Sequence, residues 1–423
     1  MSSALQIFNA LKSRGLISQF TPTIEETLRT FGSNSSIYLG IDPTGDGLHI
    51  GHYLSAKVLK SFQETKAKCI CLVGGTTAQI GDPSGKFVER PCLEYEQVEK
   101  NIEKIKGDLE LLHIDSQSVQ LVNNMDWYKN MGIVEFLRDI GKNVRVNAMM
   151  NRESVSARLN SSTGISFTEF SYQLLQAYDF YYLNKKYNCT LQIGGNDQWG
   201  NITAGCDLIR KLTNQNVNGV TVPLITTANG QKIGKSAGNC IYLNPQKTSH
   251  YDFYQYFLQL TDEDGEKFLP YYTDLPDKEI QEIIMEHRKT PENRLVQKTI
   301  AKSLITEIRG EEAYRIASAC TDILFKRIYD NITIEEIEPY LNELPAFEIP
   351  YENIKDKKLL DVLFQCKFGP SKNIQRVIKS GGLSLNNQIV KDHLYTLKES
   401  DIIAHKWLYV KRGKRQVLII RVI

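Results

Sequence analysis

Two short apolar runs and one amphipathic run near the start of the chain follow the pattern of a parallel β-sheet. Residues 36–42 (SIYLGID) and 68–75 (KCICLVGG) are almost continuously apolar and end in polar or glycine residues, as short buried strands do. Between them, residues 49–65 (HIGHYLSAKVLKSFQET) have a helical pattern. A strand, a helix and a second strand joined by glycine-rich turns predict an α/β fold with a doubly wound parallel sheet.

Later segments first repeat this pattern and then change it. Residues 188–198 (NCTLQIGGNDQ) predict another strand that ends in a glycine-rich loop, where ligands usually bind in such sheets. From about residue 247 to 330 the apolar positions take helical spacing, as in KEIQEIIMEHRK. The first twenty residues predict an amphipathic helix of the fold, because they lack the apolar core of a secretory signal and the Arg-rich bias of a transit peptide.

Charge separates the C-terminal part of the chain from the rest. Residues 357–423 hold fourteen Lys or Arg and four acids, a net charge of +10, whereas the preceding residues carry −8. Residues 331–356 hold seven acids, one lysine and three prolines, which predicts an acidic linker before a separate basic module. The expected division is a sheet domain at 1–228, a helical domain at 229–330, the linker at 331–356 and the basic module at 357–423.

Composition narrows the class of protein further. Charged residues make up 24% and hydrophobic residues 41%, as in globular proteins, and no apolar run approaches the eighteen residues that a membrane span needs. The eight cysteines include no CxxC pair, which argues against a zinc site and a disulfide framework. We therefore expect no structural metal, no membrane partner and a reducing, cytoplasm-like compartment, with an organellar matrix as the alternative.

The segment between the first strand and the first long helix carries the strongest chemical signal. Residues 42–52 read DPTGDGLHIGH and lack the glycine spacing of a dinucleotide fingerprint. They place His49 and His52 at a helix N-terminus, where backbone N–H groups and the helix dipole favour phosphate. Gly51 permits close approach, and imidazoles can donate to phosphoryl oxygens. An isolated HxxH is more often a surface or core pair, so the full string HIGH carries the prediction.

A second motif supplies positive charge. Residues 231–239 (QKIGKSAGN) set Lys232 and Lys235 in a glycine-rich loop, where ammonium groups can stabilise the charge that develops on a leaving polyphosphate. By itself this stretch also reads as a solvated basic turn. A third stretch, GGTTAQIGDPSGK, fails the Walker spacing, so Asp82, Lys86 and Arg90 are equally compatible with surface charges and with a site.

HIGH and KIGKS in this order, about 180 residues apart, resemble the paired signatures of class I aminoacyl-tRNA synthetases. With SYQLLQAYDF at 171–180 and QIGGNDQWGN at 192–201, the chain closely resembles the bacterial and organellar tyrosyl-tRNA synthetase family from about residue 5 to the C-terminus. Leu39 stands where that family often has Cys near the ribose, and KIGKS is looser than the usual lysine loop.

The resemblance implies a role for each matching residue. The substrate phenol hydroxyl would be held by Tyr38 and Asp179, and a buried polar pair of this kind would be left unpaired by phenylalanine. The other implied tyrosine contacts are Asp82, Tyr172, Gln176, Gln192 and Gln198. The implied ATP contacts are Asp42, Gly51, Gly195, Asp197 and Lys235.

The reaction implied by the family is activation of L-tyrosine with ATP to tyrosyl-adenylate and pyrophosphate, then transfer to the 3′ end of tyrosine tRNA. The tyrosine carboxylate is ionised at neutral pH, so no general base is needed, and catalysis is positioning plus stabilisation of phosphoryl charge. Magnesium is expected on the polyphosphate without an all-protein cage. The residues that could supply the catalytic contacts are Thr44, His49, His52, Lys86, Arg90, Lys232 and Lys235.

The basic tail contains GPSKNIQRVIKSGGLSLNNQIV, which resembles the small α+β S-four-like RNA-binding fold at the C-terminus of these synthetases. Its charge suits phosphate binding, although a solubilising basic domain is the alternative. In the family the helical domain also helps to bind tRNA, and the enzyme is a homodimer joined through a connective segment of its first domain. The implied tRNA contacts are Arg210, Lys211, Ser371, Lys372, Arg376, Lys411, Arg412 and Lys414.

Two other readings compete with this one. A tryptophanyl-tRNA synthetase shares the sheet and both signatures, but YQLLQAYDF, GGNDQWGN and the basic C-terminal module favour tyrosine. A non-catalytic RNA-binding relative is disfavoured because His49, His52, Lys232 and Lys235 are all present.

Overall fold

The computed structural model describes residues 2–84, 93–114, 119–161, 164–226, 235–236, 239–325, 340–413 and 416–423. The chain divides into two compact units. The first comprises Met1–Thr248 and Leu260–Ile300, and the second comprises Ser249–Gln259 and Ala301–Ile423. Among the described helices, we find none with the length and hydropathy that a membrane-spanning segment requires.

The first unit is built on a sheet whose described strands have the order β1-β6-β5-β2-β3-β4. Neighbouring strands are parallel except for the antiparallel pair of β1 and β6. The strands are β1 (Gln19–Phe20), β2 (Ser36–Ile41), β3 (Lys68–Val73), β4 (Gln120–Asn123), β5 (Cys189–Gly195) and β6 (Asn218–Val222). The doubly wound parallel sheet and the three strands expected at 36–42, 68–75 and 188–198 are thus confirmed.

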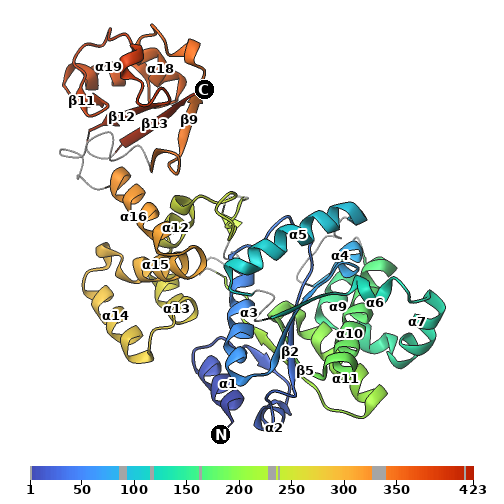
Figure 1. Cartoon of the computed structure of the whole chain (residues 1–423). Coiled ribbons are helices and arrows are strands. Elements are labelled where there is room, and N and C mark those ends of the chain that lie inside the picture. The colour runs from blue at the N-terminus through green and yellow to red at the C-terminus, as the bar shows by residue number, and fades with distance from the viewer. Residues whose placement is uncertain are drawn as a thin grey trace. The chain divides into compact units, whose positions relative to one another are not determined.

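Helices cover the sheet, and those nearest the centre frame β2 and β5. Helix α3 packs against both strands, and α10 and α11 pack against β5 and against each other; Figure 1 shows β2 and β5 between them. The helices of residues 2–248 are α1 (Ser3–Ser13), α2 (Ile24–Arg29), α3 (Ile50–Ser61), α4 (Thr77–Ile80), α5 (Tyr95–Leu111), α6 (Met125–Tyr128), α7 (Ile133–Asp139), α8 (Val146–Met150), α9 (Glu153–Leu159), α10 (Phe167–Tyr187) and α11 (Trp199–Thr213).

The alternation of side chains along β2 explains this packing. Tyr38 points to the face covered by α10, where its ring lies 5.2 Å from that of Phe180. The next residue, Leu39, points to the opposite face and is buried. The chain winds from β2 to β3 and β4 on one side and later places β5 and β6 on the other. The carboxyl ends of β2 and β5 therefore form a topological switch point, where ligands bind in open α/β sheets.

Part of the helical region belongs to the first unit. Its described helices are α13 (Asp262–Tyr272), α14 (Asp277–Lys289) and the first residues of α15 (Leu295–Arg309). The buried Lys57 of α3 donates to Thr273 O at 3.2 Å and pairs with Asp274 at 2.9 Å. These bonds attach the end of α13 to the sheet domain. The helical domain expected at 229–330 does not coincide with either unit, because its described residues are divided between them.

The second unit contains α12 (His250–Leu258), the end of α15, α16 (Glu311–Phe325) and a small α+β domain. That domain has the strand order β11-β10-β12-β13-β9, and α18 and α19 contribute to one apolar cluster with its strands. Its elements are β9 (Ala346–Ile349), α18 (Leu359–Gln365), α19 (Ser371–Lys379), β10 (Leu383–Leu385), β11 (Gln388–Ile389), β12 (Trp407–Arg412) and β13 (Gln416–Val422).

The acidic linker expected at 331–356 is wrong in its C-terminal part. Residues 346–349 form β9, which pairs in parallel with β13 as the outermost strand of the sheet. The prolines at 345 and 350 flank this short edge strand, a position that tolerates proline. Glu348 forms an ion pair with Arg421 of β13 at 2.9 Å. An acidic residue of the expected linker is thus bound to a basic residue of the C-terminal module. Residues 331–339 lie outside the described residues.

Candidate active site

A cavity of about 320 Å³ lies in the first unit at the carboxyl ends of β2 and β5. Residues from β2, α3, α10, β5 and the loops that follow the strands line it. The sequence assigned a set of residues to tyrosine, ATP or catalysis, and each of them whose side chain is described lines this cavity. They are Tyr38, Asp42, Thr44, His49, Gly51, His52, Asp82, Tyr172, Gln176, Asp179, Gln192, Gly195, Asp197 and Gln198.

Several predicted cationic residues cannot be placed in the same way. Lys86, Arg90, Lys232 and Lys414 lie outside the described residues. Of Lys235 the structure describes the backbone, which belongs to β7 (Lys235–Ser236) and pairs with β8 (Asn239–Cys240).

One end of the cavity is buried and holds the carboxylate of Asp179. Asn124 Nδ2 donates to its Oδ2 at 3.1 Å, and Trp127 Nε1 donates to its Oδ1 at 2.9 Å. Burial raises the pKa of Asp179 to about 7, although these two hydrogen bonds act in the opposite direction. Burial, followed by the charge of Asp179, also raises the pKa of Tyr38 well above its usual value. Tyr38 is therefore a neutral hydroxyl beside a dehydrated carboxyl group.

Three buried polar atoms in this cavity have no hydrogen-bond partner among the described residues. They are the Tyr38 hydroxyl, Gln176 Oε1 and Gln192 Oε1. Buried polar atoms are nearly always hydrogen-bonded, because an unpaired one loses its solvation without compensation. Three of them on the wall of one cavity indicate a site for a polar ligand rather than a packing fault.

A chain of hydrogen bonds connects this end to the turn after β2. Asp42 accepts from Thr77 Oγ1 and from the Tyr172 hydroxyl, both at 2.7 Å. A Cβ at Gly74 would lie 1.9 Å from Asp42 Oδ1, so glycine is required for the carboxylate to reach Thr77. Burial, followed by the charge of Asp42, raises the pKa of Tyr172 well above its usual value, which keeps this hydroxyl a donor.

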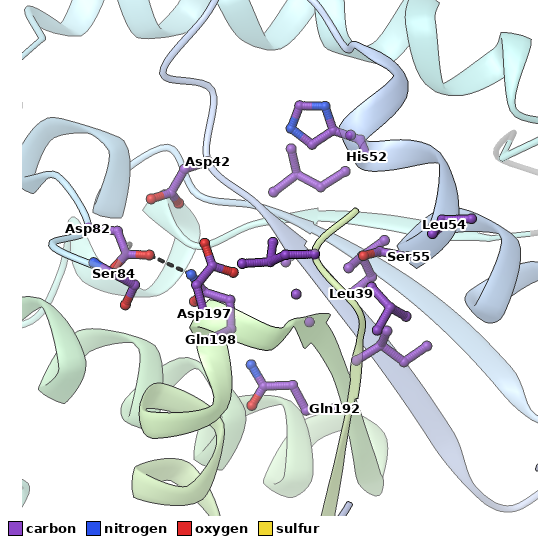
Figure 2. Close-up of a pocket in the computed structure, with 18 of the residues that line it drawn as sticks. Leu39, Asp42, His52, Leu54, Ser55, Asp82, Ser84, Gln192, Asp197 and Gln198 are labelled. Atoms are coloured by element: carbon purple, nitrogen blue, oxygen red, sulfur yellow. Dashed lines mark hydrogen bonds between the residues drawn. The ribbon is translucent and has the colours of Figure 1, made fainter. Parts of the chain in front are cut away.

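A second acid, Asp82, is fixed by the segment that follows β5. Gln198 Nε2 donates to Asp82 at 2.6 Å, and Asn201 Nδ2 donates to it at 3.4 Å. Figure 2 shows Asp42, Asp82, Asp197 and Gln198 on one side of the cavity, with His52, Leu54 and Ser55 of α3 on the other. The acidic side suits an ammonium group and ribose hydroxyls, whereas the α3 side offers donors and apolar contact.

At the start of α3 the two histidines take a defined tautomer. His49 is the N-cap, and its Nδ1 accepts from Gly51 N at 3.1 Å; His52 Nδ1 accepts from His49 N at 3.2 Å. Each Nε2 therefore carries a hydrogen and is a donor. Desolvation of the ring lowers the pKa of His52 to about 4, so this imidazole is neutral at pH 7. It can donate one hydrogen bond to an oxygen anion, but it contributes no full charge.

The segment before the lysine loop lines this part of the cavity, and the segment after the loop pairs with the start of α3. Before the loop, residues 222–225 line the cavity as β6 ends. After it, Ile50 N donates to Ile241 O at 3.0 Å, and Leu243 N donates to Leu48 O at 2.9 Å. The HIGH segment and the chain that follows the lysine loop thus pair as two short antiparallel segments.

Sequence reasoning missed several residues of the site. Thr77 donates to Asp42, and Asn124 and Trp127 donate to Asp179. Ser55 lines the α3 side of the cavity, and Tyr272 reaches the cavity from the end of α13. Asn124 follows β4 directly, and a polar residue at the carboxyl end of a parallel strand is a signal that could have found it. Nothing in the sequence places Tyr272 near residues 200 positions earlier.

The predicted tRNA contacts lie on surfaces of both units. Arg210 and Lys211 are exposed in the last turn of α11. On α19, Ile374 and Ile378 are buried in the apolar cluster, while Lys372 and Arg376 are exposed. Ser371 begins that helix, and Lys411 and Arg412 end β12. Arg412 donates to Phe368 O at 3.4 Å, which holds it beside the start of α19.

Comparisons with known proteins agree with this geometry. The family model described as tRNA synthetases class I (W and Y) matches residues 31–326, and that of the tyrosine--tRNA ligase SYY-like C-terminal domain matches residues 336–420. The tyrosine--tRNA ligase of Streptococcus agalactiae is 41% identical, with 98% of this chain and 99% of the relative covered.

Solved structures are similar as well. The C-terminally truncated mitochondrial tyrosyl-tRNA synthetase of Coccidioides posadasii has a TM-score of 0.64 and 30% identity, with 74% of this chain and 91% of that chain covered. The corresponding Aspergillus nidulans structure has a TM-score of 0.67 and 29% identity, with 75% and 94% covered. The full-length match and the C-terminal domain separate the tyrosine enzymes from the tryptophan enzymes that share the first family model. The chain belongs to the tyrosyl-tRNA synthetase family of class I aminoacyl-tRNA synthetases.

Proposed function

We propose that the protein activates L-tyrosine with ATP to tyrosyl-adenylate and pyrophosphate and then transfers the tyrosyl group to the 3′ end of tyrosine tRNA. One observation carries the proposal most directly. A single cavity holds unpaired buried polar atoms and a buried acid at one end and a helix start with two imidazole donors at the other. The first suits a phenol and the second suits phosphate.

In the proposed complex, Tyr38 and Asp179 bind the phenol hydroxyl of tyrosine. The hydroxyl donates to one oxygen of Asp179 and accepts from Tyr38, so Tyr38 gains the partner that the described residues do not supply and Asp179 gains a further donor. Asp82, Tyr172 and Gln176 bind the α-amino group, and Gln192 and Gln198 complete the tyrosine contacts. Phenylalanine leaves the Tyr38 hydroxyl unpaired and gives the buried Asp179 no further donor, and this loss produces the discrimination.

At the other end, Asp42, Gly195 and Asp197 bind the ribose, and the start of α3 binds phosphate. The tyrosine carboxylate attacks the α-phosphorus, a P–O bond forms, and the bond to the leaving pyrophosphate breaks. The Nε2–H groups of His49 and His52, with Thr44 and the backbone at Gly51, stabilise charge on phosphoryl oxygens. Lys86, Arg90, Lys232 and Lys235 supply the positive charge for the leaving group.

Magnesium accompanies ATP in this proposal. The described residues contain no cluster of three or more His, Cys, Asp or Glu that could hold a metal ion. We place the ion on the polyphosphate oxygens and water, where it neutralises phosphate charge. The proposed compartment is reducing and cytoplasm-like, since every cysteine among the described residues is free. Cys92 lies outside the described residues.

For the second step, we propose that tRNA binds the basic surfaces of the C-terminal domain and of α11. The contacts are Ser371, Lys372, Arg376, Lys411, Arg412 and Lys414 in the domain and Arg210 and Lys211 on α11. Replacing Lys372 and Arg376 with Ala should weaken aminoacylation and lower its salt dependence without changing pyrophosphate exchange, because phosphate contacts release counterions. Equal loss in both assays would refute this division of labour.

The proposed assembly is a homodimer formed through the connective segment that contains α7, α8 and the start of α10. Large apolar side chains are exposed there, including Val134 at 72% and Phe167 at 78%. Such a group on a globular surface indicates a protein interface. Val134→Asp should halve the mass in sedimentation, whereas Met285→Asp, at an equally exposed position on α14, should not. A monomeric wild-type protein would contradict the proposal.

The direct test is exchange of labelled pyrophosphate into ATP with each of the twenty amino acids. Only tyrosine should support exchange. Exchange driven by tryptophan would assign the chain to the related specificity, and no exchange with any amino acid would assign it to a non-catalytic RNA-binding role. Either result would overturn the proposed reaction.

A further inference from the structure

Helix α5 supports the phosphate-binding segment from outside the cavity. Its Asn101 donates to Pro43 O at 2.9 Å, and its Asp108 accepts from Leu48 N at 2.6 Å. Asp108 is 2% exposed, so its carboxylate is a buried charge that must be hydrogen-bonded to be tolerated. Leu48 directly precedes His49, the N-cap of α3. Asp108 therefore fixes the backbone at the point where the helix start is set.

The same carboxylate also reaches the chain that follows the lysine loop. Asn244 Nδ2 donates to Asp108 Oδ1 at 3.3 Å, while Asn244 Oδ1 accepts from Gln246 N at 2.9 Å. The Asn244 amide is thus oriented by its own turn and presents its NH₂ group to Asp108. One oxygen of Asp108 serves the HIGH segment and the other serves residues 241–247.

Lys247 also joins these two segments through Asp46, and the space beside Asp108 is too small for a side chain at position 47. Lys247 Nζ lies 2.5 Å from Asp46 Oδ1 and donates to Asp46 O at 2.7 Å. This hydrogen bond to Lys247 is the main cause that lowers the pKa of Asp46. A Cβ at Gly47 would lie 2.9 Å from Asp108 Oδ2. The glycine before Leu48 therefore lets the carboxylate reach Leu48 N.

We propose that Asp108 is a positioning residue for adenylate formation, which holds the start of α3 in register with residues 241–247. Asp108 lies outside the cavity wall and touches neither the tyrosine end nor the residues assigned to ATP. It acts through Leu48, which places His49 and His52, and through Asn244, which places the chain leading out of the lysine loop. The inference rests on the proposed phosphate role of these two elements.

The test compares Asp108→Asn with Glu110→Gln, a matched change at an exposed position of the same helix. Asparagine keeps an acceptor for Leu48 N but turns an NH₂ group toward the NH₂ group of Asn244. In tyrosine-dependent pyrophosphate exchange with the full chain, Asp108→Asn should lower kcat about tenfold to a hundredfold, the scale of a small misplacement of reacting groups. KM for tyrosine should not change, because Tyr38 and Asp179 lie on other elements. Glu110→Gln should behave as wild type.

A swapped pair separates positioning from folding. In Asp108→Asn combined with Asn244→Asp, the new carboxylate can accept from Gln246 N and from the Asn at 108, so the cross-link is restored. This double variant should regain most of the lost kcat. Titration of active sites by the tyrosyl-adenylate burst gives kcat for each folded molecule. A loss confined to the number of active sites, or no recovery in the double variant, would overturn the proposal.

Lys232→Ala and Lys235→Ala in the same assay distinguish a failure of the proposed phosphate role from a failure of the positioning role of Asp108. If both keep wild-type kcat, the proposed phosphate role of the lysine loop fails, whatever Asp108 does. If both lose kcat while Asp108→Asn does not, the positioning role of Asp108 alone is wrong.

Discussion

At the tyrosine end of the cavity, the polar groups are buried and come from β2, α10 and the turn after β4, whereas at the nucleotide end they come from a helix start and loops. Asp179 is 1% exposed and has two fixed donors in Asn124 and Trp127. His49 and His52 are half-buried, and their orientation is set by the backbone of their own turn. The first end is a preformed buried pocket, and the second is an assembly of distant chain segments.

The two ends differ in whether they determine selectivity or rate. A dehydrated acid and an unpaired hydroxyl penalise any ligand without a matching polar group, so the tyrosine end selects. Donors at a helix start bind a phosphoryl group of any substrate and act most strongly on charge that develops during the reaction, so the nucleotide end accelerates. Variants at the two ends should therefore fail in different kinetic parameters.

The largest effect is expected for Asp179→Ala. It removes the acceptor of the phenol and leaves the donors of Asn124 and Trp127 unpaired in a buried site. Loss of a buried hydrogen bond to a charged group should lower kcat/KM for tyrosine by roughly 100-fold or more. Pyrophosphate exchange measures it, with Asp277→Ala, at an exposed position of α14, as control. A variant within a few-fold of wild type would remove Asp179 from the tyrosine site.

A second change tests the nucleotide end. His52→Ala removes one neutral donor from the start of α3, and loss of a donor aimed at developing charge typically lowers kcat about 100-fold. KM for tyrosine should stay the same, because His52 lies across the cavity from Asp82 and Gln198 (Figure 2). Steady-state exchange at varied tyrosine separates the two constants. A rise in KM for tyrosine with unchanged kcat would show that the two ends are not separate.

The smallest effect is a change in pH dependence at the tyrosine end. Burial raises the pKa of Asp179 to about 7, so ionisation is disfavoured in the folded protein. Its contribution to stability is fully present below the pKa of an exposed aspartate, about 4, and is lost as pH rises through about 7.

Asp179→Asn cannot ionise, so its melting temperature should gain on that of wild type between pH 5 and pH 8, by roughly 1–2 °C for each kcal/mol in a chain of this size. Differential scanning calorimetry without ligands measures the two curves. Parallel curves would show that Asp179 is not desolvated.

The local sequence pattern predicted more of the nucleotide end of the cavity than of the tyrosine end. Apolar runs and glycine-rich turns were sufficient for β2, β3, β5 and α3, because a buried parallel strand has a strong local pattern. The full string HIGH after a strand predicted that His49 and His52 lie at a helix start, and the structure places them there. Asp179 could not be predicted in this way, since a helix-face acid beside aromatic residues has no local signal, and its role came from the resemblance. Asn124, Trp127 and Asp108 act through contacts across the fold that no local pattern records.

In the acidic segment at 331–356 the local pattern gave a wrong prediction rather than none. Its prolines and acids predicted a linker, yet β9 forms there because edge pairing with β13 and the ion pair of Glu348 with Arg421 outweigh its weak local propensity. Tyr272 is a similar case, because contacts between distant segments bring the end of α13 to the cavity: Lys57 bonds to Thr273 and Asp274, and the ring of Tyr53 lies 5.9 Å from that of Tyr272.

The most direct test of the account is a crystal structure of the protein with a non-hydrolysable analogue of tyrosyl-adenylate. The phenolic oxygen should lie within hydrogen-bond distance of both the Tyr38 hydroxyl and the Asp179 carboxylate, with the phosphate group beside the start of α3. A phenol bound elsewhere, or an analogue turned so that its adenine meets Asp179, would contradict the assignment of the two ends.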